Sequence, residues 1–314
     1  MLRVITPGLQ TTIQAAPRTG YRHYGIPYSG PADPLSMALA NKLVSNALDA
    51  PALEITYGGF SCEMLIAGTI AIAGAEGGGS LSGTRLTWHR TFRVKAGDTL
   101  SIDPPKYGVR TYLAAAGGFE AKTQFGSSST YLPAALGGFH GRALQAGDTL
   151  NWQSEIPAPS ITQTPEALRP NFTNAHAIRA CTASEIHLLD PLSKKALFEN
   201  TFTAGRQGTR MGITLEGTSL KMDSEGQMPS APVFPSTVQC PPSGQPIVLL
   251  CDAGTTGGYP RIAHVAQCDR HLLGQIRPGD SVQFLHRAPE IAALDYIQKR
   301  DLLSPWLGAS TALL

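Results

Sequence analysis

The segment from residue 244 to residue 265 concentrates the residue types that bind charged ligands. Its apolar run Ile247–Cys251 is typical of a buried strand, and a glycine-rich loop then begins at Asp252 and closes on Arg261. Glycines permit positive φ and a close approach of the backbone to a ligand, while hydroxyls and a guanidinium fork bind carboxylate or phosphate. Polar side chains at the end of a rigid strand are typical of binding sites. The loop residues that carry this prediction are Thr255, Thr256, Gly257, Gly258 and Tyr259.

A purely structural interpretation of this loop is also open. A glycine-rich hairpin turn in a β protein, with Asp252 bonded to its own backbone, has the same composition. A Walker phosphate loop is excluded, because no Gly-Lys-Ser or Gly-Lys-Thr follows the glycines. Cys251 is interpreted as a small buried hydrophobe and not as a nucleophile, since no histidine is adjacent to it in the sequence.

A second group of polar candidates lies nearer the N-terminus. Asp33 precedes Pro34 at the start of helical spacing, so its carboxylate is predicted to cap a helix, with ligand binding as the alternative. Ser29 lies in a turn rich in glycine and proline, and Glu54 interrupts the strand-like run 52–56. The Glu54 carboxylate faces either solvent or a pocket, because successive strand side chains point to opposite faces.

Two arginines in glycine-punctuated segments are further candidates for anion binding. Arg142 lies in the irregular segment 126–144, and Arg210 lies directly before the strand-like run 211–215. Long irregular loops inside compact domains are often functional, but solvated surface loops have the same composition.

The composition describes a compact, mainly β protein with few helices. The 314 residues are 42% hydrophobic and 15% charged, with 33 glycines and 24 prolines beside many short Val, Ile and Thr runs. A net charge of +2 gives no field suited to nucleic acid or to an anionic membrane. No apolar stretch has the length of a membrane span and the N-terminus lacks a signal-peptide core, so we expect a cytoplasmic protein. The five cysteines form no CxxC pair, and no metal site is assigned.

The chain is predicted to form two β units and a helical tail. The first unit covers residues 1–155, the second 175–290 and the tail 291–314, with a Pro-, Thr- and Ser-rich linker at 153–174. A Gly-Asp turn that leads into a strand recurs, which indicates one hairpin corner used three times. These turns read AGDTL at 96–100, AGDTL at 146–150 and PGDSV at 278–282, and helices are expected at 34–44, 191–199, 266–275 and 289–300.

Four stretches of the sequence resemble one known family, in the order in which the family has them. They are GIPYSGPADPLSMALANKLVSN with LEIT after it, STYLPAALGGFHGRALQAGD, TRMGITLEG, and GQPIVLLCDAGTTGGYPRIAHVAQCDRHLLGQIRPGDSVQF. Together they extend from Gly25 to Phe284. The chain is similar to the biotin-dependent carboxyltransferase-like proteins, also called allophanate hydrolase subunit 2, and within them to the branch of the 5-oxoprolinase C subunits.

This resemblance implies a fold, a reaction and partners. The fold is two tandem cyclophilin-like β-barrels, and the reaction is the ATP-dependent opening of 5-oxoproline to glutamate, a hydrolysis of a cyclic amide. ATP with magnesium is implied, together with a partner similar to the 5-oxoprolinase B subunit, and the A subunit is a further component. Lys221 has a methionine on one side only, so no covalent biotin is expected on this chain.

The resemblance also suggests roles for the candidate residues. Asp252 would bind a metal or orient water, the threonines and the Gly257-Gly258 backbone would hold phosphate or a substrate carboxylate, and Arg261 would stabilise charge. Gly254 stands where the family usually has glutamine, which leaves the substrate open. Two alternatives remain: carboxyl transfer in a biotin-dependent urea carboxylase or allophanate system, and a non-catalytic protein that antagonises a kinase inhibitor.

Overall fold

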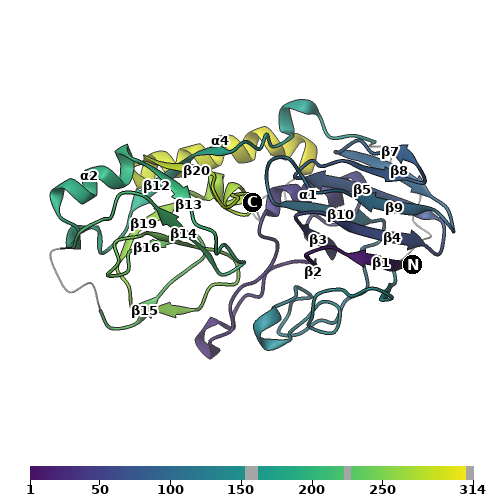
Figure 1. Cartoon of the computed structure of the whole chain (residues 1–314), viewed down its shortest axis with the longest axis horizontal. Helices are drawn as coiled ribbons and strands as arrows, with labels where there is room; N and C mark the ends of the chain where they lie inside the picture. Colours follow the sequence, from purple (N-terminus) through teal and green to yellow (C-terminus); the bar gives the residue numbers. More distant parts are fainter. Residues whose placement is uncertain (153–161, 223–227, 309–314) are drawn as a thin grey trace. The chain divides into compact units, whose positions relative to one another are not determined.

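The computed structural model describes residues 1–152, 162–222 and 228–308 and divides into two compact units (Figure 1). Unit 1 comprises Met1–Arg18, Ser29–Phe172 and the described residues from Leu303 onward. Unit 2 comprises Thr19–Tyr28 and Thr173–Leu302. A short segment near the start of the chain therefore belongs to the second unit, which no pattern in the sequence indicates.

Unit 1 consists of two antiparallel sheets that share one apolar core. The first sheet has the order β11 (Thr149–Leu150), β1 (Leu2–Pro7), β4 (Phe60–Met64), β9 (Thr99–Ile102), β6 (Gly79–Leu81) and β7 (Thr84–Arg85). The second has the order β2 (Gln10–Gln14), β3 (Ala52–Thr56), β10 (Arg110–Ala115), β5 (Gly68–Gly74) and β8 (Arg90–Val94).

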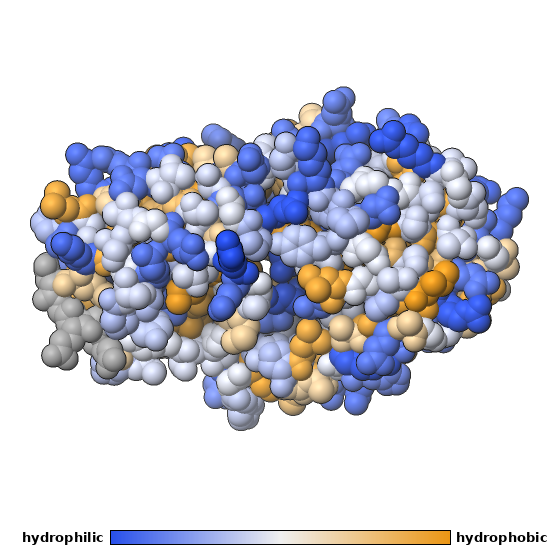
Figure 2. Space-filling model, viewed as in Figure 1, coloured by the Kyte–Doolittle hydropathy of each residue, from blue (hydrophilic) through white to orange (hydrophobic). Residues whose placement is uncertain are grey.

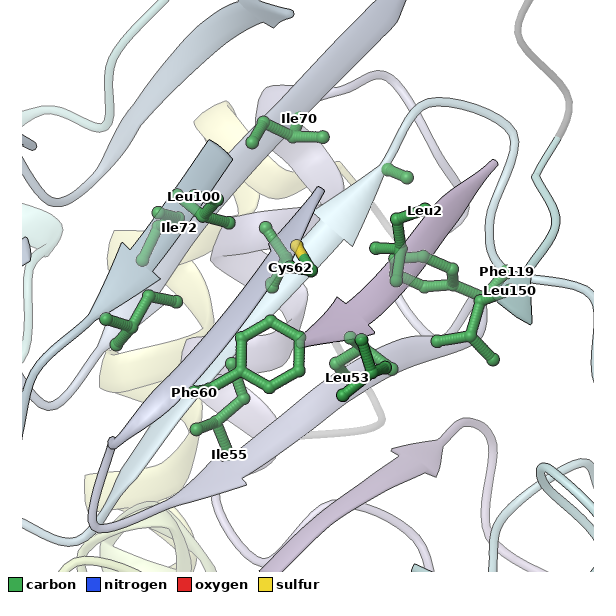
Figure 3. Close-up of a cluster of buried hydrophobic side chains, with 14 of the residues drawn as sticks. Leu2, Leu53, Ile55, Phe60, Cys62, Ile70, Ile72, Leu100, Phe119 and Leu150 are labelled. Carbon is green, nitrogen blue, oxygen red and sulfur yellow. The ribbon is translucent and has the colours of Figure 1, made fainter. Parts of the chain in front are cut away.

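Both sheets contribute alternate side chains to this core. Figure 3 shows Phe60 from the first sheet beside Leu53 from the second. Leu2 and Ile70 belong to the same buried cluster, and each of the four residues is at most 1% exposed. Burial of a side chain of this size contributes about 2 kcal/mol. The strand alternation found in the sequence therefore corresponds to one packed interior.

Helix α1 (Pro34–Leu43) covers the other face of the second sheet, where it packs on β5 and β10. The Asp33 carboxylate accepts a hydrogen bond of 2.9 Å from the backbone N–H of Ser36, so the predicted N-cap is confirmed. Because β10 is covered on both faces, all six of its residues are buried.

Unit 2 is a closed barrel that the parallel pairing of β12 with β20 completes. Its order is β12 (Ala175–Thr182), β19 (Arg261–Val265), β16 (Thr237–Gln239), β17 (Ile247–Leu249), β14 (Gly212–Glu216), β13 (Thr201–Ala204) and β20 (Ser281–His286). A two-stranded ribbon joins β15 (Ala231–Pro232) to β18 (Thr256–Gly257), and the helices are α2 (Pro191–Glu199), α3 (Arg270–Leu273) and α4 (Pro289–Leu307).

The three Gly-Asp turns share one geometry. In each turn the glycine has positive φ, and the aspartate carboxylate accepts the backbone N–H of the residue three positions earlier. The φ values are 89° at Gly97, 90° at Gly147 and 87° at Gly279, and the N–H···O distances are 2.7 Å at Lys95, 2.7 Å at Gln145 and 2.8 Å at Arg277. The predicted repeated corner is confirmed.

Several expectations about the elements need adjustment. The helix expected at 266–275 is a 3-10 turn, Gln267–Asp269, followed by the short α3, and the helix expected to end at residue 300 continues to Leu307. Part of the predicted linker, 153–161, lies outside the described residues.

In the described part of the chain, no helix is both long and apolar enough to cross a membrane. Figure 2 shows polar and apolar residues interspersed over the visible face.

Candidate functional site

The glycine-rich loop predicted to form a site runs from the end of β17 to the start of β19 in the barrel of unit 2. Its middle forms β18, whose Thr256 lies opposite Pro232 of β15. An arginine–carboxylate pair fixes each end of the loop.

Asp252 anchors the first end. Its carboxylate receives two hydrogen bonds from Arg210, Nε to Oδ2 at 2.8 Å and Nη2 to Oδ1 at 3.1 Å, and both residues are buried. The backbone N–H of Asp252 also donates to the Arg210 carbonyl at 2.9 Å. The structure thus brings these two predicted site residues together as a bidentate ion pair, the arrangement that best offsets the cost of burying two charges.

Arg261 anchors the second end. Its guanidinium donates to both carboxylate oxygens of Glu185, at 2.7 and 2.6 Å, and to the Pro232 carbonyl at 3.0 Å. The hydrogen bonds from Arg261 lower the pKa of the Glu185 carboxyl below its usual value. Arg261 is predicted to stabilise charge on a ligand, but its guanidinium N–H groups bind the carboxylate of Glu185 instead.

The hydroxyls of Thr255 and Thr256 lie between these anchors. Neither makes a hydrogen bond to another residue of the described chain, so both remain available to a ligand. The loop glycines do not use the positive φ that glycine permits: Gly254, Gly257 and Gly258 are absent from the positive-φ residues among those described. At Gly257 the smallness serves packing instead, because a Cβ there would lie 2.7 Å from the Gln239 amide nitrogen. The Tyr259 carbonyl accepts a 2.9 Å hydrogen bond from the same amide.

Arg22 lies against this loop, although no sequence pattern pointed to it. Its Cζ is 4.7 Å from the ring centroids of both Tyr28 and Phe234, and its Nη2 donates to the carbonyls of Val233 and Thr255. Its Nη1 is buried and has no hydrogen-bond partner among the described residues. Burial lowers the pKa of Arg22 from its ordinary value, and Tyr28 partly offsets this effect.

Arg270 is the second arginine that sequence reasoning missed. It begins α3, and its neighbour Asp269 is already paired with Arg179 at 2.6 Å. Arg270 itself makes no ion pair or side-chain hydrogen bond within the described parts of the chain. Burial lowers its pKa, and Cys251 and Tyr28 are among the groups that partly offset the shift.

Two arginines that have no carboxylate partner in the described chain thus lie beside one loop, Arg22 at Thr255 and Arg270 near Cys251. A partly desolvated guanidinium with unused N–H groups is an anion-binding group, and the threonine hydroxyls add neutral donors. These are the types of group that bind a carboxylate or a phosphoryl group. In the sequence these arginines stand in an ordinary turn and an ordinary helix start, and Arg22 lies more than two hundred residues before the loop.

The structure also connects the predicted residues of unit 1. Glu54 is 1% exposed, and its Oε2 accepts hydrogen bonds from the Tyr112 hydroxyl at 2.7 Å and the Ala32 N–H at 2.9 Å. The Tyr112 oxygen in turn accepts the Asp33 N–H at 2.9 Å. Burial, with Glu54 and Asp33 nearby, raises the pKa of Tyr112 well above its usual value. This network fixes the start of α1, and Ser29 precedes it with a φ of 53° and a buried Oγ without a partner among the described residues.

Arg142 is occupied by a structural contact. Its guanidinium donates to both carboxylate oxygens of Asp148, at 2.6 and 2.8 Å, and so braces one of the Gly-Asp turns. No group of three His, Cys, Asp or Glu side chains among the described residues is arranged to hold a metal ion. The expected metal-binding role of Asp252 therefore has no supporting ligand cluster in this part of the chain.

Comparison with known proteins relates the chain to two groups of enzymes. It is 36% identical over 296 residues to the 5-oxoprolinase C subunit of Escherichia coli, and the match covers 93% of each chain. It is 34% identical to the 5-oxoprolinase C subunit of Haemophilus influenzae, covering 90% of each. It is also 32% identical to urea amidolyase of Saccharomyces cerevisiae, but there it spans only 16% of the longer protein.

Solved structures agree with this relationship. The crystal structure of the Kluyveromyces lactis urea amidolyase matches 97% of the chain with a TM-score of 0.91 and 27% identity, and the chain corresponds to 20% of that protein. The predicted mainly β fold is confirmed, with the urea carboxylase structures as its neighbours, and of the two expected barrels the closed one is that of unit 2. The sequence model of the carboxyltransferase domain, subdomain A and B, matches residues 24–286. The chain is therefore a member of the carboxyltransferase domain family, subdomains A and B.

Proposed function

We propose that this chain is the C subunit of an ATP-dependent 5-oxoprolinase, which acts with a B-like partner to convert 5-oxoproline, ATP and water to glutamate, ADP and phosphate. The observation that carries the proposal is the end-to-end match with the 5-oxoprolinase C subunit of Escherichia coli, which covers 93% of both chains. The urea amidolyase match covers 16% of a much longer protein. The first match thus accounts for nearly all of the relative, whereas the second accounts for one part of it.

The arginines beside the loop of unit 2 supply the groups that such a substrate needs. 5-Oxoproline carries one carboxylate, and phosphorylation of its lactam oxygen adds charge that donors must stabilise. Arg22 has an Nη1 that no described residue uses, and Arg270 has no ion pair among the described residues. We assign the substrate carboxylate or the transferred phosphoryl group to these two guanidiniums and to the Thr255 and Thr256 hydroxyls.

The anchored pairs have a positioning role in this proposal. Asp252 with Arg210 and Glu185 with Arg261 hold the two ends of the loop, so the hydroxyls between them are presented on a fixed backbone. ATP, with magnesium, would be bound by the assembled enzyme, to which the partner supplies the remaining groups.

Reconstitution tests the proposal. The chain is coexpressed with its B-like and A-like partners, and glutamate formed from 5-oxoproline is measured with and without ATP. We expect ATP-dependent release of glutamate from the complete complex and none when this chain is omitted. Failure of the complete, correctly assembled complex to form glutamate would refute the assignment.

A second candidate function is carboxyl transfer in a biotin-dependent urea carboxylase system. The observation in its favour is the structural match with urea amidolyase, which has a TM-score of 0.91 over 97% of the chain. It is tested by offering free carboxybiotin with urea or 5-oxoproline and measuring biotin release. Biotin release that requires this chain would favour carboxyl transfer over ATP-dependent ring opening.

A further inference from the structure

Unit 1 contains a cavity of about 330 Å³ that is separate from the loop of unit 2. The end of β5, the segment before β8 and residues 169–172 line it. Its polar lining side chains include His89, Arg169, Tyr107, Asn171 and Glu76. A cavity of this size is at the lower end of the range for small-molecule sites, so a ligand would be a small metabolite.

His89 has an unusual setting in this cavity. It is 5% exposed, and its backbone has a φ of 58°, the left-handed region that residues other than glycine seldom adopt. Two backbone hydrogen bonds hold it there, one from its N–H to the Ile72 carbonyl at 2.7 Å and one to its carbonyl from the Thr164 N–H at 3.0 Å. The strained position is thus fixed on both sides.

The ring of His89 has no hydrogen-bond partner among the described residues, and its Nδ1 is fully buried. A buried N–H without an acceptor is costlier than a buried lone pair without a donor, so the neutral ring carries its proton on Nε2. Since Nδ1 is enclosed and His89 lines the cavity, the Nε2–H edge is the one that faces it. The ring therefore offers a donor to a ligand.

Arg169 supplies a positive charge in the same cavity. Its Nε and Nη2 donate to the Thr164 carbonyl at 3.0 and 2.8 Å, and no described residue accepts from its Nη1. Thr164 also holds the His89 carbonyl, so one residue positions both ligand-facing side chains. Arg169 makes no ion pair with a carboxylate of the described chain.

We propose that this cavity binds a small molecule that carries one carboxylate, held by the Arg169 guanidinium and the His89 Nε2–H. Glu76 lines the same cavity, so a phosphate with two negative charges is disfavoured there, whereas a ligand with an N–H group near its carboxylate is favoured. This inference does not depend on the reaction assigned to the loop of unit 2.

Histidine NMR of the full chain, labelled in its rings, tests the proposal. The His89 signal is assigned by its loss in His89→Asn, since asparagine tolerates the left-handed backbone. N-acetylglycine is the carboxylate probe, acetamide is the probe without a carboxylate, and triglycine represents the carboxyl end of a peptide. We expect a saturable shift of the His89 signal with N-acetylglycine and none with acetamide.

Matched variants locate the binding. Arg169→Gln is expected to weaken N-acetylglycine binding by at least about tenfold. Arg90→Gln makes the same change of charge at a neighbouring arginine that binds Gln163 and does not line the cavity, so binding should be unchanged. Arg270→Gln should also leave it unchanged, which separates this cavity from the loop of unit 2.

Three results would overturn the proposal: no saturable shift with either carboxylate probe, an equal shift with acetamide, or unweakened binding in a folded Arg169→Gln protein. Stronger binding of triglycine than of N-acetylglycine would support the site with a peptide terminus as its ligand. The reverse order would support it with a free acid.

Discussion

Acidification should destabilise unit 1 through His89, and replacement by asparagine should remove that effect. Burial, with Arg169 nearby, lowers the pKa of His89 from 6.5 to about 4. In the unfolded chain the ring takes up a proton near pH 6.5, but in the folded chain it does so only near pH 4. The stabilisation is therefore complete above pH 6.5 and is lost as the pH falls from there towards 4.

The size of the effect follows from the two pKa values. Linkage gives a loss of about 2 kcal/mol at pH 5 and roughly 3 kcal/mol below pH 4, relative to pH 8. His89→Asn changes the packing by an amount that does not depend on pH, so only the pH-dependent difference between the two proteins reports the ionisation.

Tryptophan fluorescence measures this effect in the correct unit. Trp88, Trp152 and Trp306 are the three tryptophans of the chain, and all belong to unit 1. Urea unfolding followed by fluorescence at pH 8 and pH 5 should show that the wild-type protein loses about 2 kcal/mol more than His89→Asn. Equal losses in the two proteins would show that the folded ring is protonated as easily as the unfolded one.

Three further predictions concern unit 2. Arg270→Lys keeps the positive charge but loses the planar guanidinium, so kcat/KM of the reconstituted enzyme should fall by about ten- to a hundredfold while the fold is unchanged. Unchanged kinetics would show that Arg270 does not belong to the site. Asp252→Asn should lower the stability of unit 2, measured by calorimetry, by about 3–5 kcal/mol, because it leaves the buried Arg210 charge unpaired. The double variant Asp252→Leu with Arg210→Met should regain much of the lost stability, and if it does not, the ion pair is not the cause of the loss. Gly254→Gln should change the free energy of unfolding by less than about 0.5 kcal/mol, because a Cβ at this position has only the Thr256 carbonyl oxygen within 4 Å, at 3.5 Å. A larger loss of stability would mean that the fold requires glycine here.

Local signals in the sequence predict local structure well. The Asp33 cap with Pro34 at the start of α1, and the Gly-Asp turns, are defined by contacts within a few residues, so their spacing alone identifies them. The strand before the candidate loop is likewise recognisable from Ile247 onward. The alternation of apolar residues predicts the mainly β fold because successive side chains of a strand point to opposite faces.

The chemistry of the candidate site is less predictable, because it depends on which charges meet across the fold. Asp252 and Arg261 are identifiable as polar residues at a strand end, but their partners Arg210 and Glu185 lie 42 and 76 positions away, and pairing occupies the groups that a ligand would otherwise use. Arg22 and Arg270 remain open only because no carboxylate in the described residues reaches them. Whether a charged side chain is available to a ligand therefore depends on the tertiary structure and cannot be seen in the sequence.

In each repeated Gly-Asp turn the aspartate carboxylate makes two kinds of contact. In each copy one oxygen holds the turn itself, and the aspartate also binds a different side chain: Ser82 at Asp98, Arg142 at Asp148 and His176 at Asp280. The three turns thus have the same backbone geometry, but their aspartates bind different side chains. Exchanging the attached group should change what a corner of the sheet holds without changing the corner, so these three places are natural positions for grafting new side chains onto the scaffold.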